Sequence, residues 1–315
     1  MTNNKIYNES CLDTLSKMPD SFIDCVITSP PYWQLRDYGY PEQWGLEPTF
    51  EEYLNHLWQM MDEIYRVLKP TGTVWINLGD TYARGTRKKD GTNHTVSDAK
   101  ENHIEPKSIP NYKGLDKCLL LIPHRFAIGC IDKGWIVRND IIWAKRNGMP
   151  ESVTDRFSKK HEYVFFMVKQ ERYYFDLDSI RDKHKWAHDK RNDGKRHQYA
   201  DDVKSQNNEW LATNAVSFNP NGKNPGSVSD FWDVTTKATT AQHYATYNDE
   251  LIKKPILAGC PEGGIIYDPF MGTGSTAEAA LRANRKFIGS EMSSKYCDIA
   301  NKRLKPYLQQ QNLFE

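Results

Sequence analysis

The sequence predicts an α/β fold in which a mostly parallel sheet carries helices on both faces. Two observations support this class. Residues 1–80 alternate short apolar runs with a long amphipathic segment. Near the other end of the chain, Gly263–Thr276 reads as a short apolar strand entering a glycine-rich turn, and the helix-like stretch Ala277–Ala283 follows it. Strand, glycine turn and helix in succession are typical of the ligand-binding edge of a parallel sheet.

The first 80 residues supply the expected elements in order. We expect buried strands at Asp24–Ile27 and Thr73–Asn77, and a helix from Phe50 to Leu68 between them. The segment Lys69-Pro-Thr-Gly72 is expected to end that helix. The helix is predicted because apolar side chains recur at helical spacing, at Tyr53, Leu54, Leu57, Met60, Met61, Ile64, Tyr65 and Leu68.

Two long polar regions interrupt the pattern. Residues 84–113 are rich in Arg, Lys, Asp and Asn without an apolar period, so they predict a loop. Residues 170–240 mix charges with isolated aromatic residues and contain no repeat. The sequence therefore predicts three parts, namely a first half of the main domain over 1–170, a distinct middle region over 171–240 and a second half over 241–315.

Composition narrows the class of protein. A chain of 315 residues with 26% charged and 38% hydrophobic residues can bury a sizeable core, and it resembles neither a disordered nor a membrane protein. The net charge of +1 excludes a uniformly basic coat for nucleic acid, so any such contact must come from local clusters. Without a run of 18 apolar residues or a secretory N-terminus, we expect a cytoplasmic protein.

The cysteines and histidines do not predict a redox or metal site. None of the six cysteines belongs to a Cys-x-x-Cys pair, so we expect reduced, mostly buried thiols. Cys260 is not expected to be a catalytic nucleophile. Enzymes that methylate carbon 5 of cytosine use a cysteine preceded by proline, whereas here Pro261 follows Cys260. His184 and His188 have the spacing of one helical turn but no Glu or Cys at ligand spacing, so we expect no zinc.

The string Thr28-Ser-Pro-Pro-Tyr-Trp33 suits the task of holding a flipped-out base by its amino group. The Ser29 hydroxyl and the Pro30 carbonyl can both accept hydrogen bonds. Pro30 and Pro31 fix φ and supply no N–H donors, so the carbonyls are held stiffly. The Tyr32 ring offers a face for stacking on a planar base. The alternative interpretation of Ser-Pro-Pro is an ordinary rigid turn.

The glycine-rich turn has the features of a cofactor cradle. Gly272 and Gly274 let the backbone approach a ligand, and the following helix presents free N–H groups. Glu291 ends the next apolar run, 17 residues after Gly274, where an acid usually contacts ribose hydroxyls. The turn lacks the Lys of a P-loop and the third glycine of a dinucleotide site. The alternatives are a simple tight turn and a solvated strand end.

Asp268-Pro-Phe-x-Gly-x-Gly resembles the S-adenosylmethionine loop of amino-methylating DNA methyltransferases. With Thr28–Trp33 upstream, the chain resembles their beta class, in which the catalytic motif precedes the cofactor loop. Ser29 before Pro-Pro-Tyr resembles the cytosine-N4 branch of these restriction–modification enzymes more than the adenine-N6 branch. The resemblance implies a doubly wound, Rossmann-like methyltransferase sheet with permuted motif order, one antiparallel strand and a smaller target-recognition insertion, which would be residues 171–240.

The resemblance also implies an activity and a set of site residues. The activity is transfer of a methyl group from S-adenosyl-L-methionine to the N4 amine of a flipped-out cytosine in duplex DNA. The base would be held by Ser29, Pro30, Pro31 and Tyr32. The cofactor would be held by Asp268, Phe270, Gly272, Gly274, Thr276, Glu291 and Glu9. Asn8-Glu9 replaces the usual Gly-Asp of the family, which shifts the expected contact with the adenine or routes it through water.

Contact with DNA is expected from the polar regions. The cations assigned to phosphates are Arg84, Arg87, Lys88, Lys190, Arg191 and Arg196. Solvated loops are the alternative, because aspartates dilute the second cluster. Near the end of the region 171–240, the segment Asn224–Val234 is longer than the usual family pattern, so we expect its loop geometry to differ from the family's.

Other functions stay open at this level. Adenine-N6 methylation uses the same scaffold, an RNA substrate is conceivable, and a non-catalytic DNA-binding regulator could share the fold. The resemblance implies a bacterial, archaeal or phage origin and a monomer or dimer. The chain is either a solitary methyltransferase or the partner of a restriction endonuclease that acts on the same site.

Overall fold

The computed structural model describes residues 1–40, 42–83, 116–145, 147–148, 151–181, 230–235 and 249–311. The polar loop predicted over 84–113 and all six predicted phosphate contacts lie outside these residues. The chain divides into two compact units, one formed by residues 1–175 with 230–315 and the other by 176–229. Of the second unit, the described part contains one short 3₁₀ turn, η2 (Asp178–Ile180).

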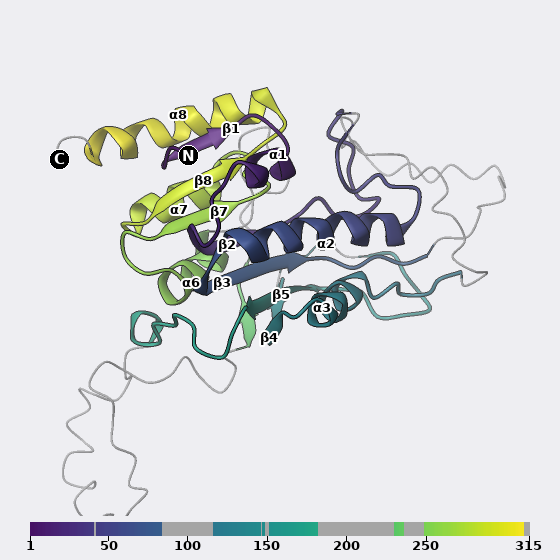
Figure 1. Ribbon diagram of the computed structural model, residues 1–315. Helices are drawn as coiled ribbons and strands as arrows, with labels where there is room; N and C mark the ends of the chain where they lie inside the picture. The colour runs from purple at the N-terminus through teal and green to yellow at the C-terminus, as the bar shows by residue number, and fades with distance from the viewer. Residues whose placement is uncertain are drawn as a thin grey trace, which may run out of the picture. The chain divides into compact units, whose positions relative to one another are not determined.

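The first unit is built on an eight-stranded sheet with the order β1-β8-β7-β2-β3-β5-β4-β6 (Figure 1). Only β5 runs antiparallel to its neighbours, β3 and β4, and the other five pairings are parallel. The fold class with one antiparallel strand is therefore confirmed. The strands are β1 (Lys5–Tyr7), β2 (Ile23–Thr28), β3 (Leu68–Leu78), β4 (Ile136–Ala144), β5 (His161–Val168), β6 (Phe231–Asp233), β7 (Ile265–Asp268) and β8 (Lys286–Ser290).

Helices cover both faces of the sheet. One hydrophobic core lies under α1 (Cys11–Ser16), α2 (Phe50–Val67) and α3 (Ile122–Asp132). A second core lies under α6 (Asp249–Gly259), α7 (Ser275–Arg282) and α8 (Ser294–Gln311). Strand β2 is buried along its whole length because it contributes side chains to both cores, which explains its nearly unbroken apolar run.

The junction between α2 and β3 differs in detail from the prediction. Thr49 caps α2, its side chain accepting the Glu52 N–H at 3.2 Å. The helix ends at Val67, and β3 begins at Leu68, which pairs with Ile23 of β2. The register shifts between Leu68 and Thr73, which lies opposite Cys25, so Lys69–Gly72 form an irregular stretch inside β3. The single pairing of Leu68 with Ile23 places the start of β3 five residues earlier than the local apolar pattern indicates.

The cysteines form no disulfide, and five of the six are buried. Burial raises the pKa of Cys260 to about 12, so its thiol stays protonated at neutral pH and is a poor nucleophile. No helix in the described ranges is long and apolar enough to cross a membrane.

Candidate active site

The two sequence motifs meet at one edge of the sheet. Strands β2 and β7 are parallel neighbours, with Val26 paired to Tyr267, so the loops that follow them leave from the same edge. The Thr28 Oγ1 donates a 2.6 Å hydrogen bond to Asp268 Oδ1 across a sequence separation of 240 residues. The structure thus joins the last residue of β2, directly before Ser29, to the last residue of β7.

Asp268 organises this junction from behind the pocket. It is 1% exposed. Its Oδ1 also accepts the Phe270 N–H at 3.0 Å, and its Oδ2 accepts the Thr276 hydroxyl at 2.6 Å. One carboxylate therefore fixes the end of β2, the glycine turn and the first turn of α7. The residue does not line the pocket, so its observed contacts are with the protein and not with the space a cofactor would fill.

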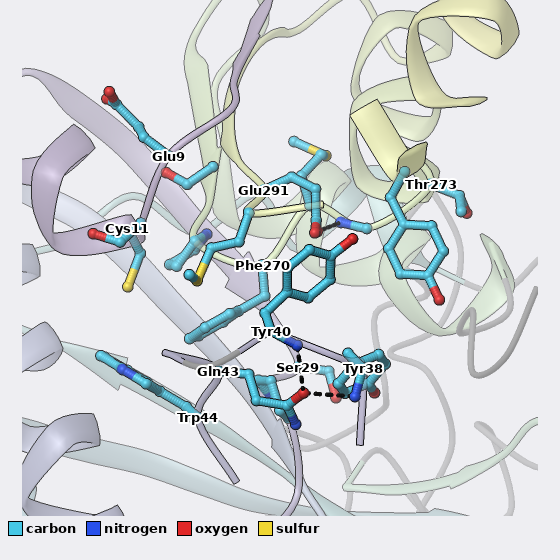
Figure 2. A pocket seen from close by; sticks show the side chains of 18 of the residues that line it. Glu9, Cys11, Ser29, Tyr38, Tyr40, Gln43, Trp44, Phe270, Thr273 and Glu291 are labelled. Carbon is cyan, nitrogen blue, oxygen red and sulfur yellow. Dashed lines mark hydrogen bonds between the residues drawn. The ribbon is translucent and has the colours of Figure 1, made fainter. Parts of the chain in front are cut away.

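A pocket of roughly 1090 Å³, measured out to its open mouth, lies at this edge (Figure 2). The predicted site residues that line it are Ser29, Pro31, Glu9, Phe270, Gly272, Thr276 and Glu291. Those that do not line it are Pro30, Tyr32, Asp268 and Gly274. The lining also includes a group that sequence reasoning missed, Tyr38, Tyr40, Gln43 and Trp44.

The two glycines of the turn serve different purposes. Gly272 has φ +55°, and a Cβ there would meet nothing nearer than the Phe270 carbonyl at 4.0 Å, so it faces open space. Gly274 has φ +84° and stands directly before α7. A Cβ on Gly274 would lie 3.0 Å from the Ala300 Cβ, so this glycine also allows α8 to pack closely.

Glu291 follows β8 and holds the turn in place. Its Oε2 accepts the Gly272 N–H and its Oε1 accepts the Ser293 N–H, each at 2.8 Å. Burial raises the pKa of the Glu291 carboxyl, and these two hydrogen bonds partly oppose that rise. Each carboxylate oxygen keeps capacity for a further hydrogen bond, so the group can still accept from a diol in the pocket.

Glu9 lines the pocket beside α1, but its carboxylate already has partners. It accepts the Thr14 hydroxyl at 3.0 Å and forms an ion pair with Lys17. A contact between Glu9 and a bound ligand would therefore compete with, or add to, these two interactions.

An aromatic segment just after the catalytic motif forms one wall of the pocket. Gln43 Oε1 accepts the Tyr38 N–H at 2.6 Å, which folds the segment on itself. The Tyr40 hydroxyl donates to Ser293 Oγ at 2.6 Å, which ties the segment to the start of α8. Trp44 makes an edge contact with Phe270 at 5.4 Å between ring centroids. The density of aromatic residues in this non-periodic stretch is a sequence signal that could have identified it.

Ser29 is held by one polar neighbour from β3 and one from its own motif. Its Oγ lies 3.4 Å from Asn77 Oδ1 and 3.5 Å from the Tyr32 hydroxyl. The single Tyr32 hydroxyl hydrogen has two acceptors within reach, Glu162 Oε2 at 2.7 Å and Asn77 Oδ1 at 3.0 Å. Glu162 is in turn paired with Lys145. Neither Asn77 nor Glu162 was predicted from the sequence to take part in the site.

The carbonyls and rings of the motif are not equivalent. The Pro31 carbonyl accepts the Tyr53 hydroxyl at 2.8 Å, whereas the Pro30 carbonyl accepts no hydrogen bond from a residue in the described ranges. The Tyr32 ring packs against Gly79, where a Cβ would approach it to 2.5 Å. Burial raises the pKa of the Tyr32 hydroxyl well above its usual value, so it stays a neutral donor.

Comparison with known proteins gives a consistent result. The profile of a DNA methylase family, N6_N4_Mtase, matches residues 23–302. The chain is 34% identical over 302 residues to the Type II methyltransferase M.Cfr9I of Citrobacter freundii, covering 95% of this chain and 87% of that one. It is 32% identical over 301 residues to the Type II methyltransferase M.SmaI of Serratia marcescens, covering 95% and 90%.

Solved structures share the fold. The PvuII DNA methyltransferase, described as cytosine-N4-specific, superposes with a TM-score of 0.62 at 18% identity, covering 96% of this chain and 86% of that one. A putative DNA modification methylase of Thermus thermophilus, solved in complex with S-adenosyl-L-methionine, gives a TM-score of 0.56 at 19% identity, covering 96% and 95%.

Proposed function

The chain belongs to the N6/N4 DNA methylase family, and on that premise we propose that it transfers a methyl group from S-adenosyl-L-methionine to the N4 amine of a cytosine in duplex DNA. The observation that carries the proposal is the buried hydrogen bond between Thr28 and Asp268. It ties the segment that presents Ser29 to the turn that presents Gly272. An acceptor for an amine and a cradle for a nucleoside cofactor then share one pocket.

The residues in the pocket fit S-adenosyl-L-methionine. Glu291 retains acceptor capacity for ribose hydroxyls, and Gly272 leaves the backbone open to a ligand. Phe270 and Trp44 present aromatic surface for the adenine or for the cationic sulfonium. When bound, the cofactor supplies an electrophilic methyl group on that sulfonium.

Ser29 and Pro30 supply the chemistry expected of the protein. A cytosine amine is a poor nucleophile because its lone pair is delocalised into the ring. Acceptors for both amine hydrogens, the Ser29 Oγ and the Pro30 carbonyl, favour the pyramidal geometry in which the lone pair is free. The Pro30 carbonyl accepts no hydrogen bond from a described residue, so it is available for this role. With the cofactor bound, these acceptors would hold the amine facing the methyl group, and the surplus amine proton would pass to Ser29 or water.

The target base must leave the helix to reach Ser29, and Tyr32 is proposed to support it there. Its neutral hydroxyl is anchored by Glu162, so the ring has a fixed position beside Ser29. The phosphate contacts of the six cations named above, among them Arg84 and Arg196, remain predictions. The full-length similarity to Type II methyltransferases supports a place in a restriction–modification system with an endonuclease of the same specificity.

The test is identification of the modified nucleoside. Purified protein is incubated with unmethylated DNA and tritiated S-adenosyl-L-methionine, and the DNA is then digested to nucleosides. Labelled N4-methylcytosine supports the proposal. N6-methyladenine would retain the family and the cofactor but overturn the base assignment made from Ser29. In a parallel incubation with RNA, label on RNA alone would change the substrate, and cofactor binding without any transfer to either nucleic acid would indicate a regulator.

A further inference from the structure

The described loop residues 151–160, which precede β5, lie at the same sheet edge as the catalytic motif. Because β5 is antiparallel, its first residues lie beside the end of β3, with Tyr163 paired to Leu78. Glu162, at the foot of this loop, accepts the Tyr32 hydroxyl at 2.7 Å. The loop is therefore directly connected to the catalytic motif.

Phe157 in this loop is 97% exposed, more than any other large hydrophobic residue in the described ranges. The next values are 59% for Ile128 and 53% for Ile131, both on α3. A single exposed apolar side chain is common on protein surfaces and carries no meaning alone.

The residues next to Phe157 in the chain make polar contacts, although the Phe157 side chain is exposed. Arg156 forms an ion pair with Glu151 at 2.5 Å and lies over the Tyr82 ring, 3.9 Å from its centroid. The Arg156 Nη1 also donates to the Phe157 carbonyl at 3.1 Å. On the other side, Asp155 pairs with Lys117 at 2.5 Å. These contacts hold the backbone on the N-terminal side of Phe157, while its ring projects into solvent.

The residues after Phe157 add positive charge. Glu151, Asp155 and Glu162 are each paired with a cation, while Asp80, which also faces Lys159, accepts backbone N–H groups. Lys159 and Lys160, in contrast, form no ion pair with a described residue. Lys159, which is half-buried, and Lys160, which is exposed, follow the exposed ring by two and three residues. Cations beside an apolar ring match a polyanion whose interior is a stack of flat bases.

We propose that Phe157 is a wedge that enters the base stack of duplex DNA beside the target nucleotide as that nucleotide is extruded toward Ser29. Lys159 and Lys160 contact the adjacent phosphates. The inference rests on the proposed function, because it takes duplex DNA as the substrate. Five residues of extended chain reach at most about 18 Å, so Phe157 is close enough to Glu162 for one duplex to contact both the wedge and the catalytic motif. Inserted apolar side chains compensate for the unstacking of a base step.

The test separates extrusion of the base from chemistry. The wild-type protein is first used to map the modified base in plasmid DNA. Two oligonucleotide duplexes are then made, one with the target base paired and one with the target facing an abasic site. An unpaired base is easier to extrude, so it depends less on a wedge. Rates are measured by tritiated methyl transfer for Phe157→Ala, Phe157→Leu and the control Ile131→Ala.

We expect Phe157→Ala to lower the rate on the paired duplex by roughly 10-fold or more, while its rate on the abasic duplex stays within about twofold of wild type. Phe157→Leu should retain most of the activity, and Ile131→Ala should match wild type on both duplexes. The thermal midpoint of Phe157→Ala should not change, since the ring makes no packing contact to lose.

An unaffected rate on the paired duplex, or equal losses on both duplexes, would overturn the wedge. A shift from dimer to monomer accompanied by equal losses would assign Phe157 to a subunit interface. Failure of the wild-type protein to methylate any DNA would be a different result, because it would remove the proposed function before Phe157 is tested.

Discussion

The buried bond from Thr28 to Asp268 offers a direct test of how the two motifs are held together. Thr28→Val keeps the shape of the side chain and removes the hydroxyl donor. Both residues are 1% exposed, so water is poorly placed to replace that donor. A hydrogen bond to a charged group contributes about 1.5–3 kcal/mol. We expect the free energy of unfolding to fall by about that amount, which leaves a folded protein with measurable activity.

The effect on methyl transfer should be larger than a simple loss of stability explains. Asp268 also holds the Phe270 N–H and the Thr276 hydroxyl, so losing the Thr28 bond frees the end of β2 from the glycine turn. A misplacement of about 1 Å between reacting groups can lower a rate by roughly 100-fold. We therefore expect kcat to fall by about 10-fold or more at saturating cofactor.

The assays are urea unfolding followed by circular dichroism, and tritiated methyl transfer to unmethylated DNA. Thr28→Ser is the matched control, because it keeps the hydroxyl and loses one methyl group, which costs about 1 kcal/mol of stability. It should retain a kcat near wild type. A Thr28→Val protein with wild-type kcat, and an unfolding free energy within about 0.5 kcal/mol of wild type, would refute the role given to this bond.

Three further predictions concern the pocket. Ser29→Ala should bind cofactor normally in calorimetry but lose turnover by roughly 100-fold, and unchanged turnover would contradict its role as an amine acceptor. Tyr32→Phe removes the donor to Glu162 and should lower kcat by about 10-fold without changing cofactor affinity; equal losses of both would point to a folding defect instead. Because burial raises the pKa of Glu291, its carboxylate is protonated at a higher pH than an ordinary Glu, so cofactor affinity should fall as pH decreases through that raised pKa. Calorimetry of Glu291→Gln should give weaker binding with little dependence on pH, and a wild-type pH profile in that variant would exclude the group.

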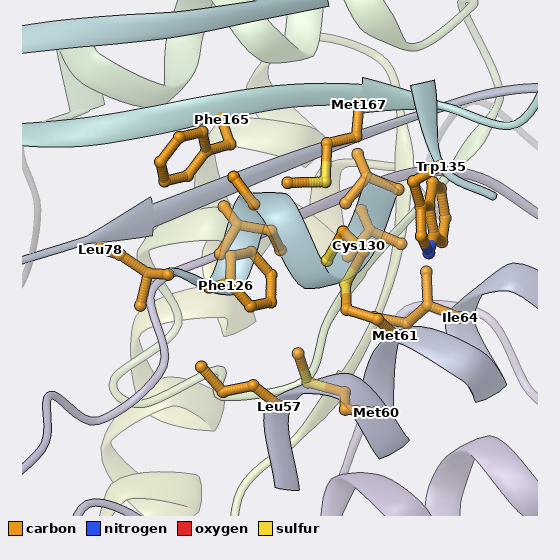
Figure 3. Packing of buried hydrophobic residues seen from close by; sticks show 14 of the residues in the cluster. Leu57, Met60, Met61, Ile64, Leu78, Phe126, Cys130, Trp135, Phe165 and Met167 are labelled. Carbon is orange, nitrogen blue, oxygen red and sulfur yellow. The ribbon is translucent and has the colours of Figure 1, made fainter. Parts of the chain in front are cut away.

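The fold could be predicted because its signals are local. The helical spacing of Leu57, Met60, Met61 and Ile64 corresponds to the face of α2 that packs towards Phe126 of α3 (Figure 3). Similarly, a glycine turn between an apolar run and a helix is typical of the ligand-binding edge of a parallel sheet. The start of β3 could not be predicted in the same way, because it depends on the pairing of Leu68 with Ile23 of β2 across an irregular register and not on a local pattern.

Much of the candidate site depends on contacts that no local pattern encodes. Asn77 and Glu162 reach Tyr32 from 45 and 130 residues away, through the register of β3 and β5. The residues around Asp268 predicted a cofactor loop, but they did not predict that the Asp268 carboxylate faces the protein. Its direction depends on Thr28 of the neighbouring strand β2, which donates to it. The segment from Tyr38 to Trp44 has no periodicity, so its position against α8 follows only from the folded chain.

The order of strands has a consequence for how the enzyme is made. The central strand β2 is complete by residue 28, but its neighbour β7 begins at Ile265, and β1 waits for β8 at the other end of the chain (Figure 1). At 5–20 residues per second, roughly 12–50 s of translation separate the two sides of the pocket. A nascent chain on the ribosome therefore carries an open sheet edge along β2 for most of its synthesis, and it cannot act on DNA until its last elements emerge. Selection on this protein should extend to chaperone protection of that edge, a demand that a methyltransferase with adjacent motifs would not face.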